Sequence, residues 1–233
     1  MTGPVLRGVV LVTGTGTGIG KTMTTAALAA AALAAGARVC VVKPVQTGTA
    51  GDQPGDIAEV ARLLAGLPAG ETSRLELHEF FRLPEPLAPQ AAARRAGVSL
   101  PPLAEHAERI AKLAAQADLV LVEGAGGLLV RLDGVDAAGA DLADLAGLVP
   151  ELTGAVIVTG AELGTLNVTE LTVQALRHRG VAVTGLVIGR WPAGPGPAEL
   201  DNLHALPELT GVPLLGVIPD RPTRPPRLLP GPG

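Results

Sequence analysis

The sequence is almost free of aromatic residues and contains a single cysteine. Among its 233 residues there is no tyrosine, one tryptophan (Trp191) and one pair of phenylalanines, Phe80 and Phe81. Cys40 has no second cysteine to pair with, which excludes an intramolecular disulfide and favours a reducing compartment, the cytoplasm. The core must therefore be built from small aliphatic side chains, and a GC-rich genome explains the missing aromatics without assigning them a function.

Three further absences narrow the class of protein. No apolar run reaches the ~18 residues of a membrane span. The net charge of −4 lacks the basic excess of a general nucleic-acid binder. A signal peptide is not expected, because a glycine-rich loop begins where its apolar region should lie. These features predict a protein with neither nucleic acid nor a membrane as its partner.

Short β-branched runs alternate with longer segments rich in alanine and leucine. The runs are continuously apolar, which is typical of strands covered on both faces in a parallel sheet. The predicted strands are 9–13, 38–43, 119–123, 155–159, 183–188 and 214–218, and the predicted helices are 21–35, 56–64, 101–116, 142–148, 165–179 and 198–209. We expect one doubly wound α/β domain over residues 1–220, with helices on both faces. Residues 221–233 are rich in proline and glycine and are predicted to form a flexible tail.

The strongest motif is GTGTGIGKT, Gly14 to Thr22, between the first predicted strand and the first predicted helix. Glycines let backbone N–H groups turn inward and cradle phosphate oxygens at a helix N-terminus. Lys21 would bridge the outer phosphates and the Thr22 hydroxyl would bind Mg²⁺. The alternative is a glycine-rich turn with a solvated lysine, but Gly-Lys-Thr opens a helix directly after a buried strand. The fold is therefore expected to be of the P-loop NTPase type. The residues assigned to the nucleotide are Thr15, Gly16, Thr17, Gly18, Ile19, Gly20, Lys21, Thr22 and Met23.

Charged residues end two other predicted strands, where sites of open α/β sheets lie. Lys43 closes the second strand, and its alternative is a lysine that merely reaches solvent. Glu123 closes the strand 119–123 and is followed by glycines, as a second metal ligand requires. Asp56 opens a helix and is either a further ligand or an N-cap. The segment Leu163–Asn167 starts another helix, which either binds an anion or is an ordinary capped helix.

The remaining residues of interest are assigned no catalytic, metal-binding or nucleotide-binding role. Cys40 is expected in the core. The histidines show no metal-ligand spacing and are read as surface or structural residues: His78, His106, His178 and His204. Asp141 and Asp144 are read as part of a solvated helix face. Phe80, Phe81 and the segment 84–89 are expected to form a loop beside the substrate.

Four motifs in order along the chain resemble the dethiobiotin synthase family: Thr13–Thr22, Lys43–Gly48 (KPVQTG), Val122–Gly127 (VEGAGG) and Leu163–Asn167 (LGTLN). The resemblance runs from about residue 9 to 220 and includes the loop spacing of five residues between Gly14 and Gly20. It implies a cyclo-ligase that joins CO₂ to 7,8-diaminononanoate using ATP and Mg²⁺. The amine forms a carbamate, ATP converts it to a carbamic–phosphoric anhydride, and the second amine closes the ring.

The same resemblance assigns residue roles. Lys21, Lys43 and Thr47 would be catalytic; Thr22, Asp56 and Glu123 would hold Mg²⁺. The substrate would contact Thr47 and, through its carboxylate, a helix start across a homodimer interface. That helix start comprises Gly164, Thr165, Leu166 and Asn167. Further nucleotide contacts would come from Asp56, Glu123, Gly124, Ala125, Gly126, Gly189, Arg190, Pro219, Asp220 and Arg221.

Two positions depart from the family pattern. Gly18 stands where some members carry an acidic residue. Gly189 stands where relatives place an asparagine that reads adenine, so only backbone groups would read the base. We therefore predict relaxed base selectivity, with CTP or GTP accepted beside ATP.

Rival functions on this scaffold fit less well. A partitioning or membrane-cycling ATPase would carry an extra lysine early in the loop, where position 16 is Gly16. The synthetase part of an amidotransferase would need a glutaminase cysteine, and Cys40 is badly placed for it. A pure nucleotide-binding module would not need Lys43 and Glu123 at strand ends.

Overall fold

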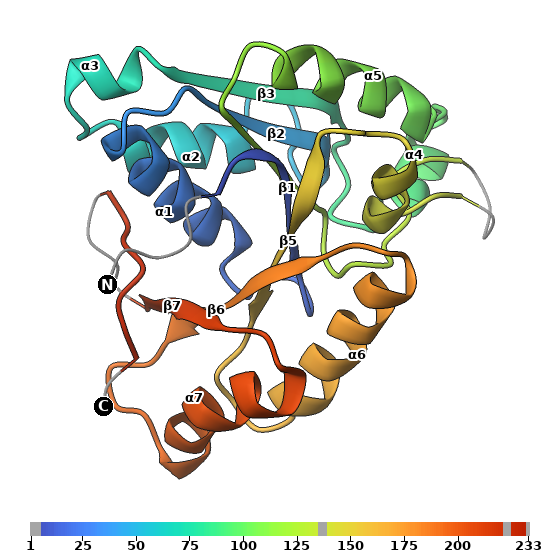
Figure 1. Ribbon diagram of the computed structural model, residues 1–233. Coiled ribbons are helices and arrows are strands. Elements are labelled where there is room, and N and C mark those ends of the chain that lie inside the picture. Colours follow the sequence, from blue (N-terminus) through green and yellow to red (C-terminus); the bar gives the residue numbers. More distant parts are fainter. Residues whose placement is uncertain (1–5, 135–138, 221–224, 232–233) are drawn as a thin grey trace.

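A seven-stranded, entirely parallel sheet forms the centre of the molecule, in the order β3-β2-β4-β1-β5-β6-β7 (Figure 1). The computed structural model describes residues 6–134, 139–220 and 225–231. The strands are β1 (Gly8–Gly14), β2 (Val39–Gln46), β3 (Leu75–Arg82), β4 (Leu119–Glu123), β5 (Leu152–Thr159), β6 (Val183–Trp191) and β7 (Leu214–Pro219). The predicted parallel α/β fold is confirmed, and the six predicted strands are all present.

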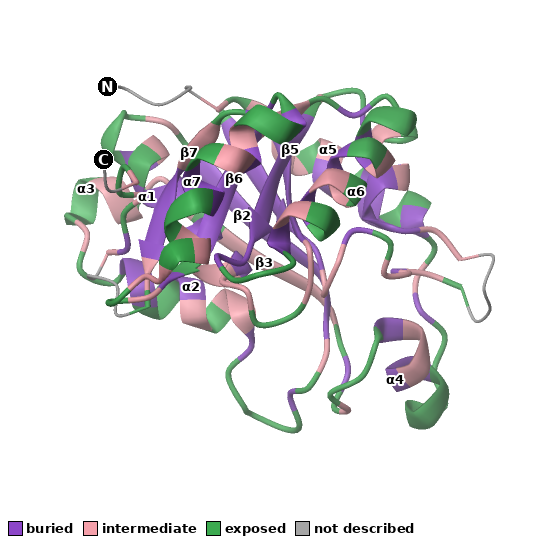
Figure 2. Cartoon of the chain, turned by 90° about the horizontal axis from the view of Figure 1, so that it is seen from below, coloured by how far each residue is buried: buried purple, intermediate pink, exposed green. Residues whose placement is uncertain are grey.

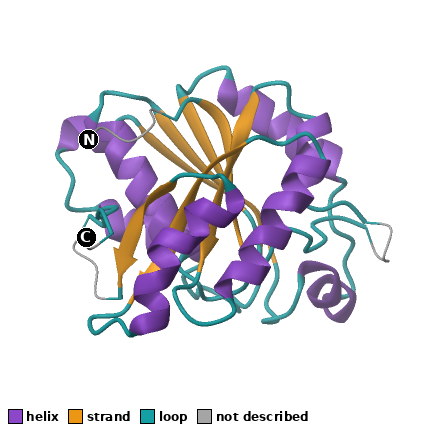
Figure 3. Ribbon diagram, turned by 60° about the horizontal axis from the view of Figure 1, so that its bottom comes forward, coloured by secondary structure: helices purple, strands orange, loops and turns teal. Residues whose placement is uncertain are grey.

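Helices cover both faces of the sheet (Figure 3). They are α1 (Lys21–Ala34), α2 (Asp56–Leu64), α3 (Ala69–Thr72), α4 (Pro89–Ala96), α5 (Leu103–Ala114), the 3₁₀ helix η1 (Leu142–Gly147), α6 (Thr165–His178) and α7 (Pro197–Thr210). Buried residues of α1 and α2 pack on one face, and those of α5, η1, α6 and α7 pack on the other. The strands of the sheet are largely buried (Figure 2). Valine, leucine, isoleucine and alanine fill both layers, as the scarcity of aromatics requires. No described helix is long and apolar enough to span a bilayer.

The strand β3 and the short helices α3 and α4 are absent from the sequence prediction. β3 reads Leu-Glu-Leu-His-Glu-Phe-Phe-Arg and lies at the sheet edge beside β2, where one side meets solvent. Its charged residues break the continuous apolar pattern used to find the inner strands. Phe80 and Phe81 therefore belong to an edge strand, and their assignment to a loop beside the substrate was wrong.

The pair Asp141 and Asp144 is not a solvated helix face. The side chain of Asp141 is fully buried and forms ion pairs with Arg131 (2.6 Å) and Arg179 (3.1 Å). Its carboxylate also caps η1 by accepting a hydrogen bond from the backbone of Ala143. Burial and the neighbouring Asp144 nonetheless raise the pKa of Asp141. Helical spacing alone does not reveal partners that lie far away in sequence.

The described part of the tail, residues 225–231, is attached to the sheet. Val217 and Leu229 exchange two backbone hydrogen bonds in an antiparallel bridge. β7 is an edge strand, so a proline-rich segment can pair with it at one non-proline residue. Leu229 is therefore paired with the sheet edge, and the flexibility of the tail stays a prediction. Arg221, predicted to contact the nucleotide, lies outside the described residues.

Candidate active site

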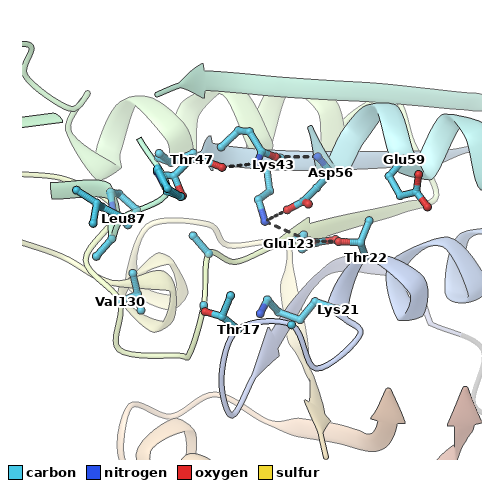
Figure 4. A pocket seen from close by; sticks show the side chains of 18 of the residues that line it. Thr17, Lys21, Thr22, Lys43, Thr47, Asp56, Glu59, Leu87, Glu123 and Val130 are labelled. Atoms are coloured by element: carbon cyan, nitrogen blue, oxygen red, sulfur yellow. Dashed lines mark hydrogen bonds and ion pairs between the residues drawn. The ribbon is translucent and has the colours of Figure 1, made fainter. Parts of the chain in front are cut away.

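A cleft of about 820 Å³ opens at the carboxyl ends of β1, β2 and β4 (Figure 4). Parallel strands bring their carboxyl ends to one edge, so residues far apart in sequence meet there. Twelve predicted site residues line this cleft: Thr17, Gly18, Gly20, Lys21, Thr22, Met23, Lys43, Thr47, Asp56, Glu123, Ala125 and Gly126. The cleft is therefore assembled from three of the four motifs that the sequence singles out.

The loop between β1 and α1 contains two glycines with positive φ, Gly18 and Gly20. Gly20 precedes α1 with a φ of 96°, which a glycine adopts without strain. A Cβ on Gly189 would overlap the carbonyl oxygen of Ile19, so β6 touches this loop backbone to backbone. Glycine at position 189 thus permits a close approach of β6 to the loop.

Lys21 is buried in this loop, and its ammonium donates to the carbonyl oxygen of Gly16 at 2.7 Å. Burial, together with repulsion from Lys43, lowers the pKa of Lys21 to about 8. The Lys21 ammonium is buried and contacts a neutral carbonyl rather than a carboxylate. Phosphate oxygens would therefore bind it strongly, because they supply the negative charge that stabilises a buried cation.

Lys43 lies at the centre of a buried charge cluster. Its ammonium contacts Asp56 at 2.6 Å and Glu123 at 3.1 Å, and donates to the carbonyl oxygen of Gly124 at 2.9 Å. Its side chain is only 4% exposed. Burial would lower the pKa of Lys43, but the two carboxylates outweigh it and raise the pKa. The reading of Lys43 as a lysine that reaches solvent is therefore wrong.

The three predicted metal ligands converge in the same cluster. The Thr22 hydroxyl donates to Glu123 at 3.0 Å, and Asp56 and Glu123 share Lys43 as a partner (Figure 4). Burial would raise the pKa of Asp56, but Lys43 holds it below its usual value, so this carboxylate is ionised. A hydroxyl and two carboxylates are the hard oxygen donors that Mg²⁺ prefers. The residues present therefore fit the ion.

Two supporting residues escaped the sequence prediction. Thr25 is fully buried and donates to Glu123 at 2.8 Å. Thr25 lies three residues after Thr22, on the same face of α1, so helical spacing could have predicted that both hydroxyls point toward one partner. Gln46 accepts from the backbone of Asp56 at 2.8 Å and donates to the carbonyl of Thr47. Only the folded structure shows that Gln46 connects the strand end to the start of α2.

The remaining predicted residues lie outside this cleft. Gly164, Thr165, Leu166 and Asn167 start α6, with Gly164 and Asn167 exposed. At the end of β6, Arg190 pairs with Asp220 at 3.0 Å, and the Asp220 backbone donates to the carbonyl of Trp191. Thr15, Gly16, Ile19, Gly124 and Pro219 do not line the cleft, although the carbonyls of Gly16 and Gly124 hold the two lysines.

Cys40 and His106 both belong to the interior. Cys40 is buried in β2, and burial raises the pKa of its thiol to about 12. His106 is fully buried on α5 and stacks on Phe80 with ring centres 5.9 Å apart. Burial lowers the pKa of His106, which therefore stays neutral. Both predictions of a structural role fit these positions.

Comparison with curated proteins decides the family. The ATP-dependent dethiobiotin synthetase BioD of Streptomyces avermitilis is 54% identical over 187 residues, covering 79% of this chain and 72% of that protein. The protein of the same name from Rhodococcus erythropolis is 50% identical over 211 residues, covering 91% of this chain and 88% of that protein. The chain belongs to the dethiobiotin synthetase family. Residues 8–225 also match a family described as an AAA domain.

Solved structures support the fold of this family member but not its activity. The cell-division ATPase MinD of Pyrococcus furiosus aligns with a TM-score of 0.56 at 20% identity, covering 93% of this chain and 84% of that chain. The signal recognition particle 54 kDa protein of Aeropyrum pernix aligns with a TM-score of 0.51 at 20% identity, covering 92% of this chain and 42% of that chain. These likenesses establish a P-loop NTPase fold. The function must be argued from the site.

Proposed function

We propose that this chain catalyses the ATP-dependent closure of 7,8-diaminononanoate and CO₂ to dethiobiotin, releasing ADP and phosphate. The observation that carries the proposal is the buried Lys43, held between Asp56 and Glu123 at the mouth of the phosphate loop. A switch ATPase needs a loop lysine and metal ligands. A reaction that gathers a carbamate and a γ-phosphate needs a second fixed cation, because two anions must approach each other.

In this mechanism the two lysines stabilise different anions, the nucleotide phosphates and the carbamate. Lys21 would leave the Gly16 carbonyl and bind the outer phosphates. Lys43 would hold the carbamate against the γ-phosphate, while Thr47 orients the reacting end of the diamine. Thr22, Asp56 and Glu123 would hold Mg²⁺, which neutralises phosphate charge when bound. Pro86, Leu87 and Val130 form a less polar wall that excludes water from the anhydride.

The base of the nucleotide would be read loosely. Gly189 offers only backbone groups, and its close contact with the loop leaves no space for a reading side chain. Arg190 and Asp220 already pair with each other near this point. We expect CTP and GTP to serve beside ATP. Competition binding tests this, because a preference for ATP of about 100-fold, or ~2.7 kcal/mol, contradicts it.

A homodimer would complete the substrate site. The start of α6 exposes apolar side chains that a soluble surface usually hides, with Leu163 89% and Leu171 56% exposed. The backbone N–H of Thr165 donates to the carbonyl of Glu162, so other N–H groups at this helix start would meet the substrate carboxylate of the partner's cleft. The buried, single cysteine fits the cytoplasm as the proposed compartment.

The function is tested by phosphate release with ATP, Mg²⁺ and bicarbonate, measured with and without 7,8-diaminononanoate. We expect phosphate release to require the diamine and to match, mole for mole, a cyclic urea identified by mass. Hydrolysis that ignores the diamine and yields no such product would favour the switch ATPase instead.

A further inference from the structure

A chain of buried threonine hydroxyls joins the phosphate loop to the start of α6. Thr159, the last residue of β5, is fully buried, and its Oγ1 lies 3.3 Å from that of Thr15 in the loop. The same Oγ1 lies 2.7 Å from the hydroxyls of Thr165 and Thr169 on α6. One side chain therefore contacts both the nucleotide loop and the helix proposed to hold the substrate carboxylate.

The direction of these hydrogen bonds follows from counting hydrogens. Thr165 donates to the carbonyl oxygen of Gly160 at 2.8 Å, and a carbonyl can only accept. A hydroxyl has one hydrogen and two acceptor positions. Thr159 must therefore donate to Thr165, and Thr15 and Thr169 must both donate to Thr159. The chain is polarised from the loop toward the helix, and Thr159 uses its full donor and acceptor capacity.

This arrangement ties the position of one site to that of the other. The backbone of Thr15 also donates to Val158 at 3.0 Å, so the loop is fixed to the same strand end that holds α6. Hydrogen bonds weaken steeply with distance and angle. A shift of the loop is therefore resisted by the first turn of α6, and a shift of α6 is resisted by the loop.

We propose that Thr159 is a positioning residue that couples phosphate-loop occupancy to the order of the α6 start. Bound phosphates fix the loop, the loop holds Thr15 on Thr159, and Thr159 holds Thr165. The substrate half of this proposal rests on the proposed function, whereas the link between loop and helix does not. In a dimer, the nucleotide of one subunit would thereby prepare the carboxylate site used by its partner.

Four substitutions separate positioning from simple stability. Thr159→Val keeps the shape but removes the shared hydroxyl, and Thr159→Ser keeps the hydroxyl. Thr169→Val removes one donor while leaving the path from Thr15 to Thr165 intact. Thr172→Val, on the exposed side of α6 where Thr172 donates to the carbonyl of Val168, is the matched control.

The first readout is amide hydrogen exchange of residues 163–170, with and without Mg²⁺ and the β,γ-methylene analogue of ATP. In the unmodified protein the analogue should slow exchange about fivefold, the worth of one hydrogen bond of ~1 kcal/mol. Thr159→Ser, Thr169→Val and Thr172→Val should retain this slowing, and Thr159→Val should lose it. No slowing in the unmodified protein, or equal loss in Thr159→Val and Thr169→Val, would overturn the proposal.

The second readout is the KM for 7,8-diaminononanoate. Thr159→Val should raise it about tenfold, equivalent to 1.4 kcal/mol, while Thr159→Ser and Thr169→Val stay within about threefold. A KM equal in Thr159→Val and Thr169→Val would reduce Thr159 to a structural residue. If the unmodified protein does not turn over the diamine, the proposed function fails, but the exchange result still decides the coupling.

Discussion

Replacing Lys43 by methionine tests the charge cluster most severely. The change keeps the length and apolar stem of the side chain but removes the cation shared by Asp56 and Glu123. Breaking a buried ion pair by removing one partner costs about 3–5 kcal/mol. Asp56 is 36% exposed and can turn toward water, whereas Glu123 is 2% exposed and retains the hydroxyls of Thr22 and Thr25 as donors. We therefore expect the lower end, about 3 kcal/mol.

The assay is urea or thermal unfolding without nucleotide. For a chain of this length, 1 kcal/mol corresponds to about 2–4 °C, so Lys43→Met should lower Tm by roughly 6–12 °C. Lys112→Met is the control, since Lys112 is exposed on α5. The double variant Lys43→Met/Glu123→Gln should regain much of the loss, because it removes both partners of the pair. Added Mg²⁺ should stabilise Lys43→Met more than the unmodified protein, since the ion would replace the lost cation.

Turnover should fall with Lys43→Met by about 10²–10³, the range seen when one fixed stabiliser of transition-state charge is removed. The reasoning is refuted if Lys43→Met unfolds like Lys112→Met and keeps its turnover within about threefold.

Four further outcomes are expected. Lys21→Met should raise the Kd for nucleotide at least about tenfold while leaving Tm nearly unchanged, measured by calorimetry; an unchanged Kd would place the phosphates elsewhere. Cys40 should resist thiol reagents up to pH 9 until urea unfolds the chain, because its pKa is near 12; rapid labelling of the folded protein would contradict its burial. Hydrogen bonds from Arg38 lower the pKa of Asp118 to about 2, so this pair stabilises the fold above about pH 4 and is lost as pH falls through 2. Asp118→Asn should therefore lower Tm at pH 7 but not near pH 2, and an equal effect at both would contradict the pairing. Leu171→Glu should shift the sedimentation of the protein toward a monomer, and an unchanged dimer would place the interface elsewhere.

The inner strands could be predicted from sequence because each is buried on both faces and is therefore continuously apolar. The edge strand β3 could not, since one side of it meets solvent and carries Glu76 and His78. The tail pairing was missed for a related reason. Proline content excludes a central strand, but a single bridge at Leu229 needs only one free N–H on the edge of the sheet.

The cleft could be predicted because three motifs end parallel strands or begin the helices that follow them. Lys43 and Glu123 could be expected to converge because both lie at the ends of parallel strands, whereas the role of Asp56 beside them was implied by the family resemblance. The supporting contacts could not be predicted in this way. The helical spacing of Thr25 from Thr22 was the one local signal, whereas Gln46 and Asp141 meet their partners Asp56, Arg131 and Arg179 only after folding. The helix start Gly164–Asn167 stays a prediction, because its proposed ligand belongs to a second subunit.

The most direct test of the central claim is the stoichiometry of phosphate and product in one reaction. With ATP, Mg²⁺, bicarbonate and 7,8-diaminononanoate, the account predicts one phosphate released for each cyclic urea formed, and neither without the diamine. Phosphate release that continues at the same rate without the diamine, with no urea detected by mass, would contradict it.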